Sequence, residues 1–265
     1  MIAWRAMVVL SNLQSLRVVD QLEERYPAFD GLNLTFETRE GILKHCSRAN
    51  AVTLEAAEPG GVGRRFIDHM QPSLEAQLCN LADEIAYNAH DIDDGVRSGL
   101  VTAQQVQEVE LFGQFHAATL TEYPRLQGRR LLYESIRRML SAQVYDVIAA
   151  TAAAVDAARP GSTDQVRSLP ALVSFSDSMR ARSTELKVFL RHNLYRHPRV
   201  EHTTGLAKQV VRDLFAAYLS DPAQMQAGFA ARANTSRAVA DYIAGMTDRF
   251  AAREHERLTG RSLLV

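Results

Sequence analysis

Residues 81–95 decide the fold, and they read LADEIAYNAHDIDDG. Apolar side chains recur within and just before this stretch at the spacing of one helical face, at Leu78, Leu81, Ile85 and Ile92. The pattern predicts a helix from about Ser73 to Ile92, closed by Gly95 and Gly99. Its apolar face is expected to anchor the helix in a core.

The same periodicity continues on both sides of this helix, whereas the alternation typical of strands is nearly absent. We therefore predict an all-α protein. Residues 50–65 contain Glu58-Pro59-Gly60-Gly61, which favours a loop. The spacing of Ser11 and Gln14 is that of a capping box at the start of the first helix. The expected helices lie at about 13–26, 39–45, 102–120, 128–158, 176–196, 203–219 and 234–258.

Pro160-Gly161 and the polar residues after it form the clearest linker in the chain. This linker predicts one helical domain at residues 1–158 and a carboxy-terminal helical subdomain at residues 159–265. A single domain is the alternative, because helical domains also contain loops of this kind.

Composition excludes several classes of protein. The net charge of -1 gives no overall attraction to nucleic acid or to anionic membranes. Cys46 and Cys79 have no metal-like spacing and are expected to be free thiols in a reducing compartment. No stretch approaches the roughly 18 apolar residues that a membrane span needs, and the apolar run before Ser11 is too short for a signal peptide. These features predict a soluble, cytoplasmic protein.

Three polar residues of the central helix have a spacing that suits chemistry. Asp83, Tyr87 and Asp91 recur every fourth residue and so lie along one stripe of the helix. Two carboxylates flanking a phenol suit a phosphorylated sugar. The first carboxylate can hold a metal, the phenol can donate to a phosphate oxygen, and the second carboxylate can accept from a sugar hydroxyl. A solvated acidic stripe is the commoner origin of such a pattern. A calcium loop beginning at Asp91 does not fit, because Gly95 comes one position early and Thr102 replaces the required Glu.

Four blocks of sequence, at residues 14–19, 31–45, 81–95 and 241–250, occur in the order found in one enzyme family. They read QSLRVV, GLNLTFETREGILKH, LADEIAYNAHDIDDG and DYIAGMTDRF. In these blocks the chain resembles the dGTPase-like deoxynucleoside-triphosphate triphosphohydrolases of the HD superfamily. The resemblance implies a multi-helix HD-domain-like fold, with residues 1–158 as the remainder of the HD-type domain.

The resemblance also implies roles for individual residues. Asp83 matches the last ligand of a histidine/aspartate metal site, which in this family holds a divalent cation such as Mg²⁺ or Mn²⁺. Tyr87 then faces the triphosphate of a deoxynucleoside triphosphate, and Asp91 faces its deoxyribose. Asp241 and Tyr242 would shape the substrate pocket or a subunit contact, with ordinary helix packing as the alternative. The family often forms dimers or larger rings, so a homo-oligomer is expected.

The chain departs from the family upstream of residues 14–19. Relatives carry a first His, a His-Asp pair and further histidines there, whereas only 13 residues precede Gln14 and none is His. We therefore expect an HD fold that is amino-terminally truncated relative to the family and lacks three of four metal ligands. No catalytic residue is assigned within the chain, which alone is expected to be inactive.

Other histidines and arginines are weaker candidates for the site. His90-Asp91 is a His-Asp dipeptide, but the family has an equivalent dipeptide here that does not bind metal. His192 and His197 have a zinc-like spacing without a nearby cysteine or acidic partner. The paired arginines suit phosphate contacts but are more often solvated; they are Arg64-Arg65, Arg129-Arg130 and Arg137-Arg138.

Three hypotheses about function remain. The chain is a triphosphohydrolase that is active once its metal site is completed by a further segment, or a catalytically inactive paralogue that serves as a regulatory or oligomerising subunit. The third is a gene remnant that folds poorly.

Overall fold

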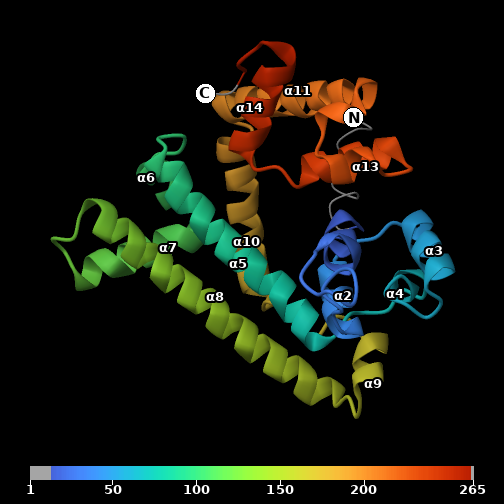
Figure 1. Ribbon diagram of the computed structural model, residues 1–265. Coiled ribbons are helices and arrows are strands. Elements are labelled where there is room, and N and C mark those ends of the chain that lie inside the picture. Colours follow the sequence, from blue (N-terminus) through green and yellow to red (C-terminus); the bar gives the residue numbers. More distant parts are fainter. Residues whose placement is uncertain (1–12, 264–265) are drawn as a thin grey trace. The chain divides into compact units, whose positions relative to one another are not determined.

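The computed structural model describes residues 13–263, and these residues are helical apart from their connections (Figure 1). Within this range no strand forms, and the extended backbone makes only two isolated bridges, Glu24 with Gly31 and Tyr26 with Phe29. The predicted all-α class is confirmed. Two compact units divide the chain, Met1–Val188 and Phe189–Val265. The capping box at Ser11 lies outside the described residues.

Helices of different lengths build the first unit, beginning with a helical turn at residues 13–17. They are η1 (Val18–Leu22), α2 (Phe36–Ile42), α3 (Arg48–Ala57), α4 (Arg64–Ile67), α5 (Leu74–Arg97), α6 (Ala103–Gln107), α7 (Glu110–Glu122), α8 (Gly128–Ala158), α9 (Thr163–Ser168) and α10 (Asp177–Leu190).

The central helix α5 begins where the sequence predicts and ends later. The Ser73 hydroxyl caps it by accepting from the backbone N–H of Ala76 at 3.3 Å. The helix continues through the buried Gly95 to Arg97, and the chain leaves it at Gly99, whose φ is +69°. The predicted apolar face is buried at Leu81, Ile85 and Ile92, but Leu78 is 50% exposed. The inclusion of Leu78 in the core was therefore wrong.

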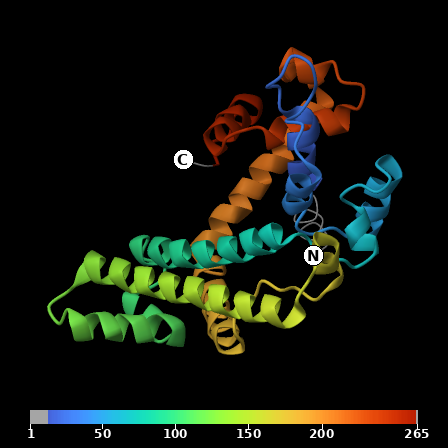
Figure 2. The ribbon, with the colours of Figure 1, turned by 90° about the horizontal axis from the view of Figure 1, so that it is seen from below.

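Helices α5, α7 and α8 form the largest packed group of this unit. Figures 1 and 2 both show α5 lying along α8, with α7 against the amino-terminal part of α8. The helix predicted at 102–120 is interrupted: α6 ends at Gln107 and α7 starts at Glu110. A Cβ on Gly113 would lie 2.4 Å from the Gln107 carbonyl oxygen, so the approach of the two segments requires glycine.

The loop predicted at residues 50–65 was largely wrong, because α3 occupies Arg48–Ala57. The Ser47 hydroxyl caps this helix by accepting from the Asn50 N–H at 3.2 Å. The Pro and Gly residues do turn the chain, but only over residues 58–63.

Paired charges fix the amino-terminal segments to one another. The Arg39 guanidinium donates through Nε and Nη2 to the Asp20 carboxylate at 2.9 Å each, and through Nη1 and Nη2 to Glu58 at 2.9 and 2.7 Å. Gly31 has a φ of +72°, and a Cβ there would lie 2.3 Å from the backbone of Asp20. The turn before α2 can therefore pass against η1 only with glycine at this position.

The segment after the Pro160-Gly161 linker returns to the first unit. The Gln77 side chain of α5 accepts from the backbone N–H groups of Leu172 and Val173, at 2.9 and 3.2 Å, and donates to the Pro72 carbonyl. Compactness thus divides the chain after Val188. The boundary between a helical domain at residues 1–158 and a carboxy-terminal subdomain at residues 159–265 stays a prediction.

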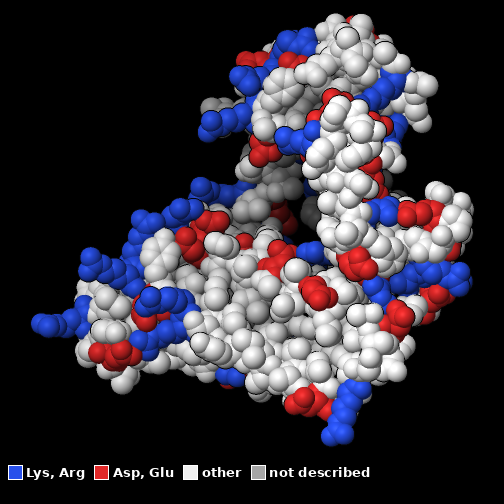
Figure 3. Space-filling model, turned by 60° about the horizontal axis from the view of Figure 1, so that its bottom comes forward, with Lys and Arg blue, Asp and Glu red and all other residues white. Residues whose placement is uncertain are grey.

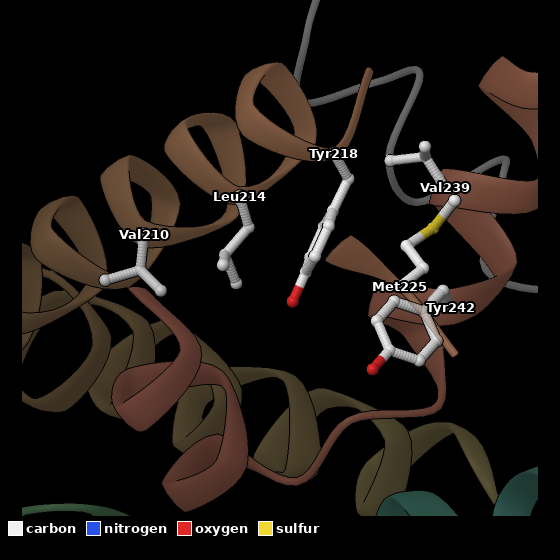
Figure 4. Close-up of a cluster of buried hydrophobic side chains, with 6 residues drawn as sticks. All are labelled: Val210, Leu214, Tyr218, Met225, Val239 and Tyr242. Atoms are coloured by element: carbon white, nitrogen blue, oxygen red, sulfur yellow. The ribbon is translucent and has the colours of Figure 1, made fainter. Parts of the chain in front are cut away.

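The second unit consists of η2 (Arg191–Tyr195), α11 (Pro198–Ser220), η3 (Pro222–Gln224), α12 (Ala227–Ala230), α13 (Thr235–Ala244) and α14 (Asp248–Thr259). The single helix expected at 234–258 is thus two helices, separated at Gly245 to Thr247. A compact apolar core lies between α11 and α13 (Figure 4). It is formed by Val210, Leu214, Tyr218, Met225, Val239 and Tyr242.

Two polar contacts tie α14 to α11 beside this core. The buried Tyr218 hydroxyl donates to Glu254 at 2.6 Å, and His255 Nε2 lies 2.9 Å from Asp213 Oδ2. Hydrogen bonds from Arg257, then from Tyr218, lower the pKa of Glu254 from its usual 4.5. The contact with His255 is the main cause of a lowered pKa at Asp213.

We predict that acid weakens the protein through these two carboxylates. Because their pKa values are lowered by folding, their stabilisation is present above the ordinary carboxyl pKa and is lost as pH falls through the lowered value. Urea unfolding followed by circular dichroism, at about pH 6 and about pH 3.5, should show a lower midpoint in acid. The Glu254→Gln variant should lose less stability over this interval than the wild type; an equal loss would contradict a contribution from Glu254.

Candidate functional site

The predicted stripe lies on one unbroken helix, since Asp83, Tyr87 and Asp91 all belong to α5. The side chain of Asp83 is 71% exposed and Tyr87 is 53% exposed, whereas Asp91 is half-buried. The stripe thus faces outward from the core formed by the opposite side of α5. Exposure of a carboxylate and a phenol one turn apart leaves both groups accessible to a ligand.

The structure brings a second sequence block to this stripe. Helix α2 packs on α5, and Lys44, two residues after α2, donates from Nζ to Asp83 Oδ2 at 3.2 Å. The blocks at residues 31–45 and 81–95 are therefore neighbours in space. The ammonium group of Lys44 therefore balances the charge of Asp83.

Residues 13–263 do not assemble a complete metal site. No group of three or more His, Cys, Asp or Glu side chains converges within them. Asp83 meets an ammonium group and not a second ligand, and several converging oxygen ligands are what holds a hard divalent cation. The described residues by themselves therefore do not fit a divalent metal.

The other histidines named from the sequence either cap a helix or lie outside the stripe of Asp83, Tyr87 and Asp91. His197 caps α11, its Nδ1 accepting from the Arg199 N–H at 3.2 Å, which removes that nitrogen from any zinc pair with His192. His90 is exposed on α5, adjacent to the stripe but not on it.

Asp241 and Tyr242 lie on α13 of the second unit. The Asp241 side chain is fully buried and pairs with Arg232 at 3.4 Å and with Arg237 at 3.2 Å. The Tyr242 ring packs edge-on against Tyr218, with centroids 5.3 Å apart, and burial raises its pKa. These contacts account for both residues as packing positions, and their role toward substrate stays a prediction.

Several paired arginines are already engaged by carboxylates. Arg64 contacts Asp68 and Glu55, and Arg138 contacts Glu134 and Glu122. On the face drawn in Figure 3, Lys and Arg are interspersed with Asp and Glu and do not form a field of one sign. This pattern gives no indication of a nucleic-acid interface.

Sequence reasoning missed Glu40 and Lys44. Glu40 has no exposed surface, and it pairs with Arg65 and Arg167. The available signal was its position one turn before Leu43, which is fully buried. Its partner Arg167 is far away in the sequence, so no local pattern identifies the pair.

Known proteins resemble the chain over most of its length. A family model described as phosphohydrolase-associated domain matches residues 173–257. The chain is 54% identical to a deoxyguanosinetriphosphate triphosphohydrolase-like protein of Ralstonia nicotianae over 249 residues, which is 93% of the chain. Proteins with the same name from Bordetella pertussis and Nitrosomonas europaea are 53% and 46% identical over the same share of the chain. The chain spans 63%, 64% and 65% of the lengths of these three relatives.

Among the described residues, none of the helices combines the length and the apolar character required to cross a bilayer.

We predict that Asp83 contributes little to folding. Its ion pair with Lys44 is exposed, so Asp83→Ala should change the free energy of unfolding by less than about 1 kcal/mol. The matched variant Glu40→Ala removes a buried carboxylate from two arginines and should cost about 3 kcal/mol or more. Urea denaturation of both variants tests the contrast, and a large loss for Asp83→Ala would mean that Asp83 is a structural residue.

Proposed function

We propose that this chain, a homologue over 93% of its length of the deoxyguanosinetriphosphate triphosphohydrolase-like proteins, forms part of an enzyme that removes triphosphate from a deoxynucleoside triphosphate. The observation that carries the proposal is the outward-facing stripe of Asp83, Tyr87 and Asp91 on α5. The stripe has the order of groups expected for a metal ligand, a phosphate donor and a sugar acceptor.

Each residue of the stripe would act on a different part of the nucleotide. The Tyr87 hydroxyl would donate to an oxygen of the triphosphate, and the Asp91 carboxylate would accept from the deoxyribose hydroxyl. Both contacts hold the substrate along the helix and so align it for attack by water. Lys44, already beside Asp83, adds a positive charge at the end of the stripe where the phosphates would lie.

The metal remains part of the proposal. Asp83 would be the ligand that this chain contributes to a Mg²⁺ or Mn²⁺ ion, with the other ligands outside the described residues. We derive no catalytic step through the ion from this chain. A homo-oligomer in the cytoplasm is the expected setting.

A second function is favoured by one observation. Within residues 13–263, Asp83 is paired with Lys44 and no cluster of metal ligands surrounds it. A catalytically inactive paralogue that acts as a regulatory or oligomerising subunit would have this arrangement and would retain the helical scaffold.

We predict that the purified chain binds deoxynucleoside triphosphates without hydrolysing them. Titration calorimetry in Mg²⁺ should show binding that Tyr87→Phe weakens by about two- to tenfold and Asp91→Ala by about tenfold or more, because each variant removes one hydrogen bond. The control His90→Ala, on the same helix but outside the stripe, should bind as the wild type does.

Chromatography of each reaction mixture separates the two functions. Release of triphosphate that Asp83→Ala abolishes would show that the chain completes a metal site and would overturn the inactive alternative. Absence of nucleotide binding by the folded chain would overturn the substrate assignment of the stripe.

A further inference from the structure

A largely apolar cavity of about 560 Å³ lies in the first unit, where the carboxyl end of α5, helices α6 and α7 and the start of α8 meet. Its apolar walls include Val96, Ala103, Phe112, Leu131 and Leu132. Pockets that hold small organic molecules have volumes of about 300 to 1,000 Å³ and mostly apolar walls with a few polar groups. The cavity therefore has the size and the lining of a ligand site.

Four ionisable side chains also line the cavity, and two of them add no net charge to it. Arg97 is paired with Asp94 at 2.6 Å. Burial lowers the pKa of His116, so its imidazole is neutral near neutral pH. Arg129 and Asp93 remain, as one positive and one negative group in the same lining.

Arg129 is held in place without a carboxylate partner. Its Nε and Nη2 atoms donate to the Tyr133 hydroxyl at 3.2 and 2.9 Å, and its guanidinium lies 5.3 Å from the centre of the Tyr133 ring. Within residues 13–263 the guanidinium forms no ion pair, and its Nη1 atom donates to no other side chain. An exposed guanidinium in this state is available to an anionic group of a ligand.

Asp93 lies on the other side of the same hydroxyl. It is half-buried near the end of α5, and it accepts from the Tyr133 hydroxyl at 3.5 Å. A single hydroxyl therefore separates the guanidinium of Arg129 from this carboxylate. A ligand with only a negative charge would be repelled by Asp93, and a ligand with only a positive charge would be repelled by Arg129. A ligand that carries both charges side by side satisfies both residues.

We propose that this cavity binds a free aromatic α-amino acid. The α-carboxylate accepts from Arg129 and the α-ammonium group donates to Asp93, while the side chain lies in the apolar part of the cavity. The rings of Phe112 and His116, with centroids 6.0 Å apart, line that part and favour an aromatic ring. The start of α8 also lines the cavity, where Gln127 provides no side-chain cap, so the helix dipole favours a carboxylate beside Arg129.

The cavity is separate from the stripe on the same helix. Asp93 follows Asp91 by two residues, and side chains at that spacing point to different sides of a helix. The ligand carries no phosphate and requires no metal, so its binding does not depend on the proposed triphosphohydrolase function. The Tyr87→Phe variant, altered on the stripe, should bind the amino acid as the wild type does.

Calorimetry of the full chain without metal compares tryptophan with two analogues that each lack one charge. Indole-3-propionate lacks the ammonium group, and tryptamine lacks the carboxylate. Tryptophan should bind about threefold or more tightly than either analogue, because each analogue loses one ion pair. Alanine has both charges but no large side chain, and should bind about tenfold or more weakly than tryptophan. Equal affinities for tryptophan and its analogues, or no binding of tryptophan, would overturn the proposal.

Two substitutions should act on opposite ends of the ligand. Asp93→Asn should weaken binding of tryptophan and tryptamine by about threefold or more, without weakening indole-3-propionate. Arg129→Ala should weaken tryptophan and indole-3-propionate by a similar factor, without weakening tryptamine. The matched control is Arg130→Ala, which removes the next arginine of α8 from outside the cavity lining and should change none of the three affinities.

Circular dichroism establishes that each variant is folded. A folded Asp93→Asn or Arg129→Ala variant that weakens all three ligands equally would show a structural role and contradict the assignment of the two charges. If either variant does not fold, Ala103→Phe still locates the ligand. Ala103 is exposed and lines the cavity, so a ring there fills the cavity and should weaken tryptophan by about tenfold or more. An unchanged affinity would place tryptophan elsewhere and refute the cavity site.

Discussion

The first unit is organised around the need to neutralise one buried carboxylate. Glu40 lies in the interior side of α2, where an unpaired charge costs several kcal/mol. Its counterions come from α4, through Arg65, and from α9, through Arg167. Arg65 also donates to the Leu43 carbonyl at the end of α2. Three segments that are far apart in the sequence are thereby held in one arrangement, and α2 packs against α5.

The parts of the fold that follow from the sequence are those with local signals. Helix α8 and the start of α5 were predictable, because long amphipathic periodicity and a capping serine are local signals. Helix α3 was missed because the Pro-Gly turn after it dominated the pattern, although Ser47 caps it. The break between α6 and α7 depends on a close approach at Gly113, which is a tertiary contact that spacing does not encode.

In the candidate site, too, the sequence predicts the features that depend on local spacing and not those that depend on tertiary contacts. Helical spacing alone placed Asp83, Tyr87 and Asp91 on one stripe, and the unbroken α5 keeps them there. Lys44 could not be assigned to Asp83, because their contact joins residues that are far apart in sequence. Asp241 is also an aspartate that a sequence motif singled out. It is buried between two arginines, and these ion pairs give it a structural explanation. Burial and partners separate the two carboxylates where sequence cannot.

Lys44 shows that the charge on the stripe depends on a tertiary contact. Its ammonium group, from the segment that follows α2, contacts Asp83 on the exposed side of α5. Because the pair is exposed, it contributes little to stability. A cation on Asp83 would compete with this ammonium group, whereas a phosphate beside it would attract the same group.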